Sequence, residues 1–467
     1  MKVLVVSPNT KLFPDPVYPI GASYITTACR NAGHEVEAFD YNFKADPKAD
    51  LAALLRTFAP DVVGISIRNV DNALKGESVS FFPVIRDLVA HVRSNCDATI
   101  ILGGSGYSLF PVEFLDYTGA DHGVVGSGEE AMVQFLRDLE AGTAVKRVIN
   151  SSKPDKDVAH TVPDRGFFDF EKYYGIGGLL GVQSQRGCTF NCSYCTYPNL
   201  EGRMLVPRQP GVVVDEIEGL IRDFKARHFF FVDSVFNHKE SHVFAICDEI
   251  IRRGLSIKWS AYVRPRFKDP DLIPTMKAAG CKSIELGTDS LAEPTMKSMN
   301  KAFTVDDVFR FSEKCSQSGI LFCQNLIFGA PGETRDTVET SIRNVLATEP
   351  TAVLGMLGIR IYPNTMIADY LVESGYLKDQ GEIGLEPIFY VDEAVKDWIA
   401  DYLVDLESRN KLFIFPGLTT PKNPFGRRLL RLLTRQGLLW EAVRYRTMGP
   451  RLKARIIKRT RGLLGMR

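Results

Sequence analysis

Three cysteines in one short stretch of the chain are the residues best suited to do chemistry. Cys188, Cys192 and Cys195 fall within eight residues, and an aromatic residue, Tyr194, directly precedes the last of them. A closed structural zinc site takes four protein ligands, whereas a 4Fe-4S cluster held by three cysteines keeps one iron open. The spacing therefore favours a cluster with an open iron. A zinc knuckle or three buried structural cysteines are the alternatives.

The order C-x-x-x-C-x-aromatic-C resembles the signature of the radical S-adenosylmethionine (SAM) enzymes. That resemblance implies a 4Fe-4S cluster on Cys188, Cys192 and Cys195, with SAM bound at the open iron and Tyr194 beside the cofactor. In this family the cluster passes one electron to SAM and cleaves it to methionine and a 5′-deoxyadenosyl radical, which takes hydrogen from unactivated carbon. The resemblance also implies an external electron donor of the flavodoxin or ferredoxin type.

Residues 1–150 alternate short apolar runs with helical patterns, which predicts a doubly wound, Rossmann-like parallel α/β sheet. The expected strands lie at residues 3–6, 36–39, 62–67, 99–104 and 123–126, and the expected helices at 20–32, 51–58 and 84–94. Ligands of such sheets bind beyond the carboxyl ends of the strands. We therefore expect the turns that follow these strands to form a binding site.

The turns after these strands are rich in glycine, and their order resembles the cobalamin-binding domain that is fused to many radical SAM enzymes. The resemblance covers residues 1 to about 145. It implies a cobalamin site made by the following residues: Asn9, Arg68, Asn69, Gly103, Gly104, Ser105, Gly106, Tyr107, Gly126, Gly128 and Glu129.

One loop departs from the pattern of many cobalamin domains. Domains that ligate cobalt by histidine carry Asp-x-His-x-x-Gly after the first strand, whereas Ser7 to Pro14 contains no histidine. We therefore expect cobalt without a histidine ligand. We place Arg68 near its lower axial face, where a cation discourages coordination by another positive centre. A salt bridge at the end of the strand is the alternative for Arg68.

After a linker at residues 151–180, strand and helix patterns alternate again over residues 181–370, which predicts a partial (β/α)6 barrel. The expected strands lie at residues 181–184, 228–232, 257–261, 283–287, 321–327 and 354–357. Catalytic residues of such barrels lie at the carboxyl ends of the strands. The cysteine loop follows the first of these strands, so the cluster is expected at the mouth of the barrel.

The same resemblance assigns roles to residues that end the barrel strands. Asp233 is expected to accept the amino group of SAM, Arg264 to face the active site, and Asp289 to stand where the family has glutamate in Gly-x-Glu-Ser. Glu333 lies in a stretch similar to the Gly-x-Pro-Gly-Glu-Thr of the cobalamin subgroup and is expected at a cofactor. Arg203 and Arg208 resemble a basic pair that neutralises cluster or cofactor charge in the family. A solvated loop is the alternative for these two residues.

The C-terminal region, residues 371–467, is expected to be mainly helical and ends in a basic segment. Residues 421–467 contain fourteen Lys or Arg and one acidic residue, Glu441. Residues 427–466 have the pattern of an amphipathic helix, which suits either packing on the protein itself or a peripheral contact with anionic lipid. No RNA-binding signature accompanies the charge, so nucleic acid is not expected. Without a signal peptide or an apolar run of about eighteen residues, we expect a cytoplasmic protein.

Together these resemblances imply a cobalamin-dependent radical SAM C-methyltransferase. The methyl group would pass from methylcobalamin to an unactivated carbon after the 5′-deoxyadenosyl radical has removed hydrogen. A cyclase or rearrangement enzyme that uses cobalamin without methyl transfer is one alternative, and a non-catalytic cobalamin sensor is another. The expected substrate is a small molecule, either a lipid, which the basic tail favours, or an amino-acid-derived compound.

Overall fold

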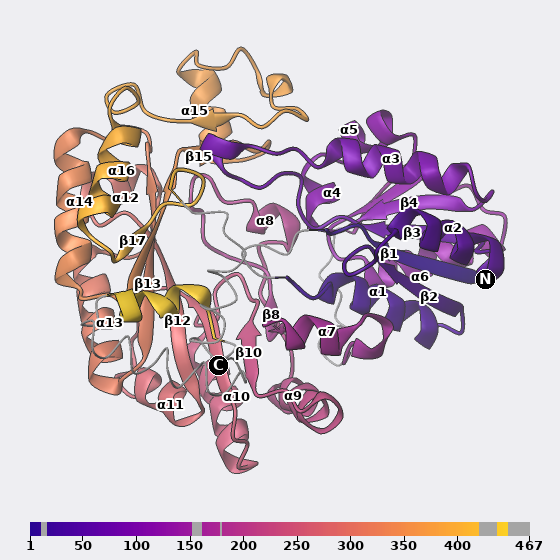
Figure 1. Ribbon diagram of the computed structural model, residues 1–467, viewed down its shortest axis with the longest axis horizontal. Helices are drawn as coiled ribbons and strands as arrows, with labels where there is room; N and C mark the ends of the chain where they lie inside the picture. Colours follow the sequence, from indigo (N-terminus) through magenta and orange to yellow (C-terminus); the bar gives the residue numbers. More distant parts are fainter. Residues whose placement is uncertain (11–15, 152–160, 178–179, 420–436, 447–467) are drawn as a thin grey trace, which may run out of the picture.

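The computed structural model describes residues 1–10, 16–151, 161–177, 180–419 and 437–446. Two α/β lobes lie side by side, the first built from the N-terminal part of the chain and the second from residues after about 180 (Figure 1). Each lobe contains one parallel sheet. The predicted fold class, a doubly wound domain followed by a partial barrel, is confirmed.

The first lobe has a six-stranded parallel sheet in the order β2-β1-β3-β4-β5-β6. Because the chain proceeds from β1 to β2 in one direction and continues with β3 on the other side, the switch point lies between β1 and β3. Its strands are β1 (Lys2–Ser7), β2 (Glu35–Asp40), β3 (Val62–Ser66), β4 (Thr99–Gly103), β5 (His122–Val125) and β6 (Val148–Asn150). Its helices are α1 (Ile20–Asn31), α2 (Pro47–Phe58), α3 (Phe82–Arg93), α4 (Ser105–Leu109), α5 (Pro111–Thr118) and α6 (Glu129–Glu140). The sixth strand was not predicted.

The second lobe has a seven-stranded parallel sheet in the order β17-β14-β13-β12-β11-β10-β7. The six predicted strands are present as β7 (Gly181–Val182), β10 (His228–Phe231), β11 (Lys258–Val263), β12 (Cys281–Asp289), β13 (Leu321–Phe328) and β14 (Ala352–Leu357). The helices between them are α9 (Pro210–Phe224), α10 (Glu240–Arg252), α11 (Leu272–Ala278), α12 (Glu293–Ser298), α13 (Val305–Ser318) and α14 (Arg335–Ala347). The seventh strand, β17 (Phe413–Ile414), comes from the C-terminal region and was not predicted, because two residues give no periodic signal.

Short elements surround the cysteine loop and the connection between the lobes. The loop is flanked by β8 (Gln185–Arg186) and β9 (Val206–Pro207), which pair antiparallel, and is followed by α8 (Tyr197–Leu200). Within the predicted linker, the described residues include η3 (Arg165–Phe167) and α7 (Phe170–Gly175). The side chains of Phe168 and Phe170 are buried, so this part of the connection is packed rather than extended. The polar stretch at 152–160 lies outside the described residues.

The C-terminal region packs on the barrel. It begins within α15 (Met366–Glu373) and contains α16 (Ile399–Arg409), η5 (Leu439–Ala442) and α18 (Val443–Arg446). Its strand β16 (Phe389–Tyr390) pairs antiparallel with β15 (Ile359–Arg360), which precedes the region. Most of the predicted amphipathic segment lies outside the described residues. In the described part, yellow in Figure 1, Leu438, Trp440 and Val443 are buried against Phe230 and Ala352 of the barrel. For this part the structure favours packing on the protein itself.

Two hydrophobic clusters join the lobes. One extends from Val5 and Met132 in the first lobe to Val182 and Ile217 in the second. The other joins the opposite face of the first sheet, including Leu102, to the C-terminal region. Burial of apolar surface on both sides of the boundary holds the two sheets in a fixed relation.

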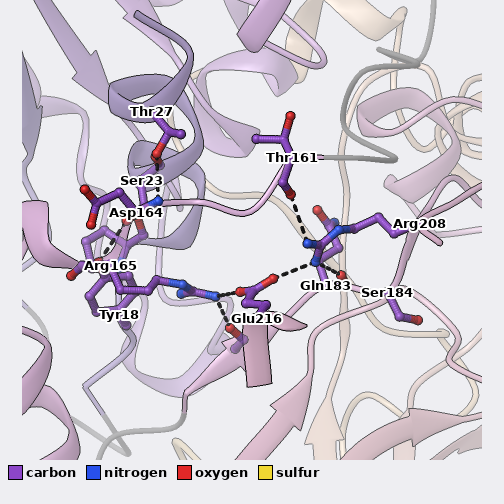
Figure 2. Close-up of polar contacts among 12 residues, drawn as sticks. Tyr18, Ser23, Thr27, Thr161, Asp164, Arg165, Gln183, Ser184, Arg208 and Glu216 are labelled. Carbon is purple, nitrogen blue, oxygen red and sulfur yellow. Dashed lines mark hydrogen bonds and ion pairs between the residues drawn. The ribbon is translucent and has the colours of Figure 1, made fainter. Parts of the chain in front are cut away.

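A buried network of ion pairs adds to this boundary (Figure 2). Glu216 of α9 pairs with Arg165, and also with Arg208, whose Nη1 lies 2.7 Å from its Oε2. Arg208 donates further to the carbonyls of Gln183 and Thr161. The expectation that Arg208 neutralises cofactor charge or lies in a solvated loop is therefore wrong, because its guanidinium is buried and its charge is paired within the protein.

Candidate functional site

A cavity of about 670 Å³ lies between the lobes, at the carboxyl ends of both sets of strands. The first lobe contributes nine of the residues predicted to bind cobalamin: Asn9, Arg68, Asn69, Gly103, Gly104, Ser105, Gly126, Gly128 and Glu129. The second lobe contributes residues from its strands and from α8, among them Arg186, Tyr197, Phe230, Tyr262 and Glu285. One cavity therefore joins the switch point of the open sheet to the interior of the barrel.

Glycines shape the wall formed by the first lobe. Gly104 has φ +95°, and a Cβ there would lie 2.5 Å from the carbonyl oxygen of Ile67, so only glycine fits this turn. A Cβ at Gly103 would meet only one atom within 4 Å, and a Cβ at Gly21 would meet none. Gly21 and Gly103 therefore leave backbone open to the cavity, as close approach of a large planar cofactor requires.

Arg68 lies in this wall, directly after β3. Its side chain is solvent-accessible in the cavity, and burial by the surrounding protein lowers the pKa of its guanidinium. Among the described residues it forms no ion pair, whereas its backbone carbonyl accepts a hydrogen bond of 2.7 Å from Ser105 Oγ. The structure therefore gives no support to the alternative of a salt bridge. Among the residues that the structure describes, the lining of the cavity includes no histidine.

Three residues predicted to contact cobalamin have other roles. Tyr107 is fully buried and packs against Gly123, and a Cβ at Gly106 would come within 2.9 Å of Ile67, so both pack in the lobe and neither lines the cavity. Glu129 does line the cavity, but its carboxylate pairs with Arg186 of the barrel lobe at 2.6 Å. The predictions for Gly106 and Tyr107 are corrected, because both residues shape the turn, whereas the cobalamin contact of Glu129 stays a prediction for a residue that also joins the lobes.

The cysteine loop places its three thiols near a buried cation. Cys188, Cys192 and Cys195 interact electrostatically with one another and with the ammonium of Lys301. Burial raises the pKa of all three thiols, while Lys301 acts in the opposite direction. Three thiols of one loop beside a cation suit a cluster, which binds sulfur as thiolate.

Tyr194 and Asp289 lie together beside this loop. Asp289, at the end of β12 with φ +61°, accepts a hydrogen bond from the Tyr194 hydroxyl and pairs with Lys301. The predicted residues Tyr194 and Asp289 are thus brought to the cluster loop, although Asp289 is shared with a lysine that sequence reasoning missed. Their contacts with SAM remain a prediction.

Two other carboxylates of the predicted site are buried and accept hydrogen bonds from the protein itself. Asp233 is fully buried and accepts hydrogen bonds from Ser184 N at 2.7 Å, from Gln185 N and from Ser184 Oγ. Burial raises its pKa to about 7 although these donors lower it. Glu333 is also buried and accepts a hydrogen bond from Gly329 N. Because neither carboxylate is accessible, the expected contacts of Asp233 with SAM and of Glu333 with a cofactor are not supported, and we reassign both as positioning residues.

Two arginines do lie at the cluster loop. The guanidinium of Arg264 stacks over Phe190, 4.6 Å from the ring centroid, and its buried Nε has no hydrogen-bond partner. Arg203 donates to the Asn191 side chain of the same loop. The expectation that Arg264 faces the active site is consistent with this position.

Sequence reasoning missed two side chains of the barrel interior. Tyr262 and Glu285 are neighbours on β11 and β12 and both line the cavity. Tyr262 is 41% exposed although it lies within a strand of the sheet. A signal was present, because Tyr262 stands two residues before Arg264. Glu285 lies between two apolar residues, Ile284 and Leu286, in the middle of a predicted strand.

Comparison with known families agrees with this geometry. Residues 9–136 match the B12 binding domain and residues 182–345 match the radical SAM superfamily. Together the two matches cover well over half of the chain. They coincide with the two sheets that form the cavity.

Individual relatives combine the same two parts. Tryptophan 2-C-methyltransferase of Streptomyces laurentii is 25% identical over 79% of this chain and 74% of its own. Anaerobic magnesium-protoporphyrin IX monomethyl ester cyclase of Rubrivivax gelatinosus is 25% identical over 62% of this chain and 54% of its own. The solved structure of the radical SAM methyltransferase TsrM from Kitasatospora setae, with cobalamin and a 4Fe-4S cluster, shares the fold with a TM-score of 0.86 at 22% identity, covering 100% of both chains.

The chain therefore belongs to the cobalamin-dependent radical SAM enzymes. Its cofactors are a 4Fe-4S cluster, SAM and cobalamin. The cysteine triad fits the cluster, and the open glycine turns with Arg68 fit the corrin. No helix among the described residues has the length and apolar content needed to cross a bilayer.

Proposed function

We propose that this enzyme transfers a methyl group from SAM, by way of cobalamin, to a carbon of a small substrate bound between its lobes. The observation that carries this proposal is the single cavity shared by the cobalamin-side turns and the barrel interior. The cysteines themselves are not part of the lining, but Thr196 and Tyr197, directly after Cys195, are. A substrate there would therefore lie beside the cluster loop as well as beside the cobalamin-side turns.

When bound, the cluster supplies an electron to SAM, and cobalamin carries the methyl group. The protein's own residues hold these groups. Cys188, Cys192 and Cys195 would hold the cluster, the backbone around Gly103 would support the corrin, and Arg68 would keep a positive charge beside it. An external donor of the flavodoxin or ferredoxin type would supply the electron.

For the substrate, we propose an amino-acid-derived small molecule. The lipid alternative depended on the basic tail, most of which lies outside the described residues, and the described part packs on the barrel. Support for the amino-acid class comes from the Streptomyces laurentii relative, named for tryptophan, and from the Kitasatospora setae protein, also solved with tryptophan and a SAM analogue.

The experiment is anaerobic reconstitution with trideuteromethyl-SAM, followed by untargeted mass spectrometry of cell extracts treated with the enzyme. We expect one S-adenosylhomocysteine for each labelled methyl group found in product. 5′-Deoxyadenosine in equal amount indicates hydrogen abstraction, and its absence beside a methylated product indicates methyl transfer without it.

Other outcomes separate the alternatives. A changed product with no S-adenosylhomocysteine would indicate a cyclase or rearrangement enzyme, the class to which the Rubrivivax gelatinosus relative belongs. Absence of both SAM by-products in the presence of reductant would indicate a non-catalytic cobalamin protein. Either result would contradict the proposed function.

A further inference from the structure

One buried carboxylate in the cavity has no part in holding the cluster or the corrin. Glu285 lies in the middle of β12, is 7% exposed and lines the cavity. It accepts hydrogen bonds from the side chains of Tyr262 and Asn325, and its Oε1 accepts one from Trp440 Nε1 at 2.9 Å. It is therefore a fixed group, held from three sides within the barrel interior.

The charge of Glu285 is balanced by hydrogen-bond donors alone. Among the described residues, no lysine, arginine or histidine forms an ion pair with it, whereas the buried carboxylates of Glu216, Glu129 and Asp289 each pair with a cation. Burial raises the pKa of Glu285, and its charge is the largest cause that raises the pKa of the adjacent Tyr262. Buried charges are ordinarily paired, so this carboxylate suits a cationic ligand.

In the part of the chain that the structure describes, the two walls of the cavity carry unpaired side chains of opposite charge. Arg68 stands in the wall formed by the first lobe and Glu285 in the wall formed by the barrel. An ammonium group is repelled by the first and attracted by the second, and in a desolvated site both effects are strong. A substrate that carries one cation is therefore oriented with that cation toward β12.

We propose that Glu285 binds a primary ammonium group of the substrate and so fixes its orientation in the cavity. This inference rests on the proposed function, because it assumes that the substrate occupies this cavity. It narrows the substrate class to amines and amino acids. It also gives the described part of the C-terminal segment a role, because Trp440 holds the carboxylate in place.

Trp440 is a positioning residue in this arrangement. Its ring packs against Phe230, Cys323 and Ala352, which fixes its N–H toward Glu285. The neighbouring Glu441 anchors the segment, because it accepts from Ser283 Oγ at 2.7 Å and pairs with Lys282.

The test uses reconstituted holoenzyme without SAM, so that binding is measured without turnover. Isothermal titration calorimetry compares tryptamine with indole-3-propionate, which share a ring and carry opposite charges. We expect tryptamine to bind at least about tenfold more tightly than indole-3-propionate, and Glu285→Gln to remove this preference. Glu218→Gln, a change at a glutamate on the outer face of α9, serves as the matched control and should leave it intact. Equal binding of both probes, no binding of tryptamine, or an unchanged preference in Glu285→Gln would overturn the inference.

A second variant tests the inference without removing the carboxylate. Trp440→Phe keeps an aromatic ring but loses the N–H that stabilises the ionised form of Glu285. Tryptamine binding needs that ionised form, so it should tighten as pH rises, and the variant should move this rise to higher pH. An unmoved pH profile would contradict the positioning role.

Glu285-dependent amine binding without methyl transfer would contradict the proposed function alone, whereas methyl transfer to a substrate without nitrogen would overturn this inference alone.

Discussion

The two walls of the cavity are built in opposite ways. In the first lobe the wall is backbone, with turns at Gly103 and Gly104 and one accessible guanidinium, Arg68, without an ion-pair partner among the described residues. In the barrel the corresponding strand ends carry charged side chains that bind partners within the protein. Asp233 accepts hydrogen bonds from backbone amides, and Asp289 forms an ion pair with Lys301. Among the described residues, Glu285 and Glu201 line the cavity without an ion pair, and Glu285 is the one that lies on a strand of the barrel sheet.

This contrast follows from the shape of each sheet. An open sheet has a switch point where the strand ends diverge, so backbone itself can line a cofactor site. A curled sheet crowds its strand ends together, so inward polar groups must satisfy one another. The difference shows that the strand-end rule locates a site but does not say which groups are free to bind.

The largest expected effect separates the two walls chemically. Cys192→Ala should abolish cluster iron, because two thiolates do not hold a 4Fe-4S cluster, while cobalamin binding on the other wall persists. Iron analysis and the absorption spectrum of the bound corrinoid measure both. Cys96→Ser, at a half-buried cysteine of the first lobe, is the control and should leave iron unchanged. Loss of the corrinoid together with iron in Cys192→Ala would argue against independent walls.

The next effect concerns the boundary that fixes the walls relative to each other. Glu216→Gln leaves Arg165 and Arg208 buried without their counter-charge, so we expect a loss of about 3–5 kcal/mol in the free energy of unfolding. Glu218→Gln, which weakens an exposed pair with Arg253, should cost no more than about 1 kcal/mol. Denaturant unfolding measures both variants. Equal costs would mean that the buried network does not hold the lobes.

Two glycines of the first wall give a matched pair. Gly104→Ala forces a Cβ against Ile67 at positive φ and should cost about 1–3 kcal/mol of stability. Gly21→Ala adds a Cβ in open space within α1, so stability should not fall, while cobalamin affinity should. Thermal unfolding and equilibrium binding of the corrinoid distinguish them. If Gly21→Ala bound cobalamin as tightly as the parent protein, the corrin would not approach the backbone at Gly21, and this part of the account would be refuted.

The effect that is smallest at each measured step concerns the buried carboxylate of Asp233 and is followed through pH. Burial raises the pKa of Asp233 to about 7, so the unfolded chain ionises before the folded one and wild-type stability falls as pH rises from about 4 to 7. Asp233→Asn keeps an oxygen for the backbone amides of Ser184 and Gln185, with its amide nitrogen donating to Ser184 Oγ, and it cannot ionise. Its stability relative to wild type should therefore rise over this range, on the order of 1 kcal/mol per pH unit. Parallel pH profiles for the two proteins would contradict the assignment.

The sequence was sufficient for much of the fold and for the cluster loop. Strand periodicity placed both sheets, and three cysteines at fixed spacing located the cluster, because those signals are local. The turn after β3 likewise placed Arg68 in the cavity. These features depend on residues close together in the chain.

Other features depend on contacts that spacing does not encode. Asp233 follows β10 as expected, but its carboxylate is taken up by the backbone of Ser184, which lies between β7 and β8 and far from it in the chain. Glu285 sits within a strand rather than at its end, and the group that orients it, Trp440, comes from 155 residues further along the chain. Such pairings are visible only once the chain is folded.

The central claim is that cobalamin lies on the path of the methyl group to a substrate in the shared cavity. The most direct measurement follows trideuteromethyl label from SAM into product with cobalamin present or omitted during anaerobic reconstitution, at equal iron content. The account predicts labelled product and S-adenosylhomocysteine only when cobalamin is present. Label in product without cobalamin, or product without label in its presence, would contradict it.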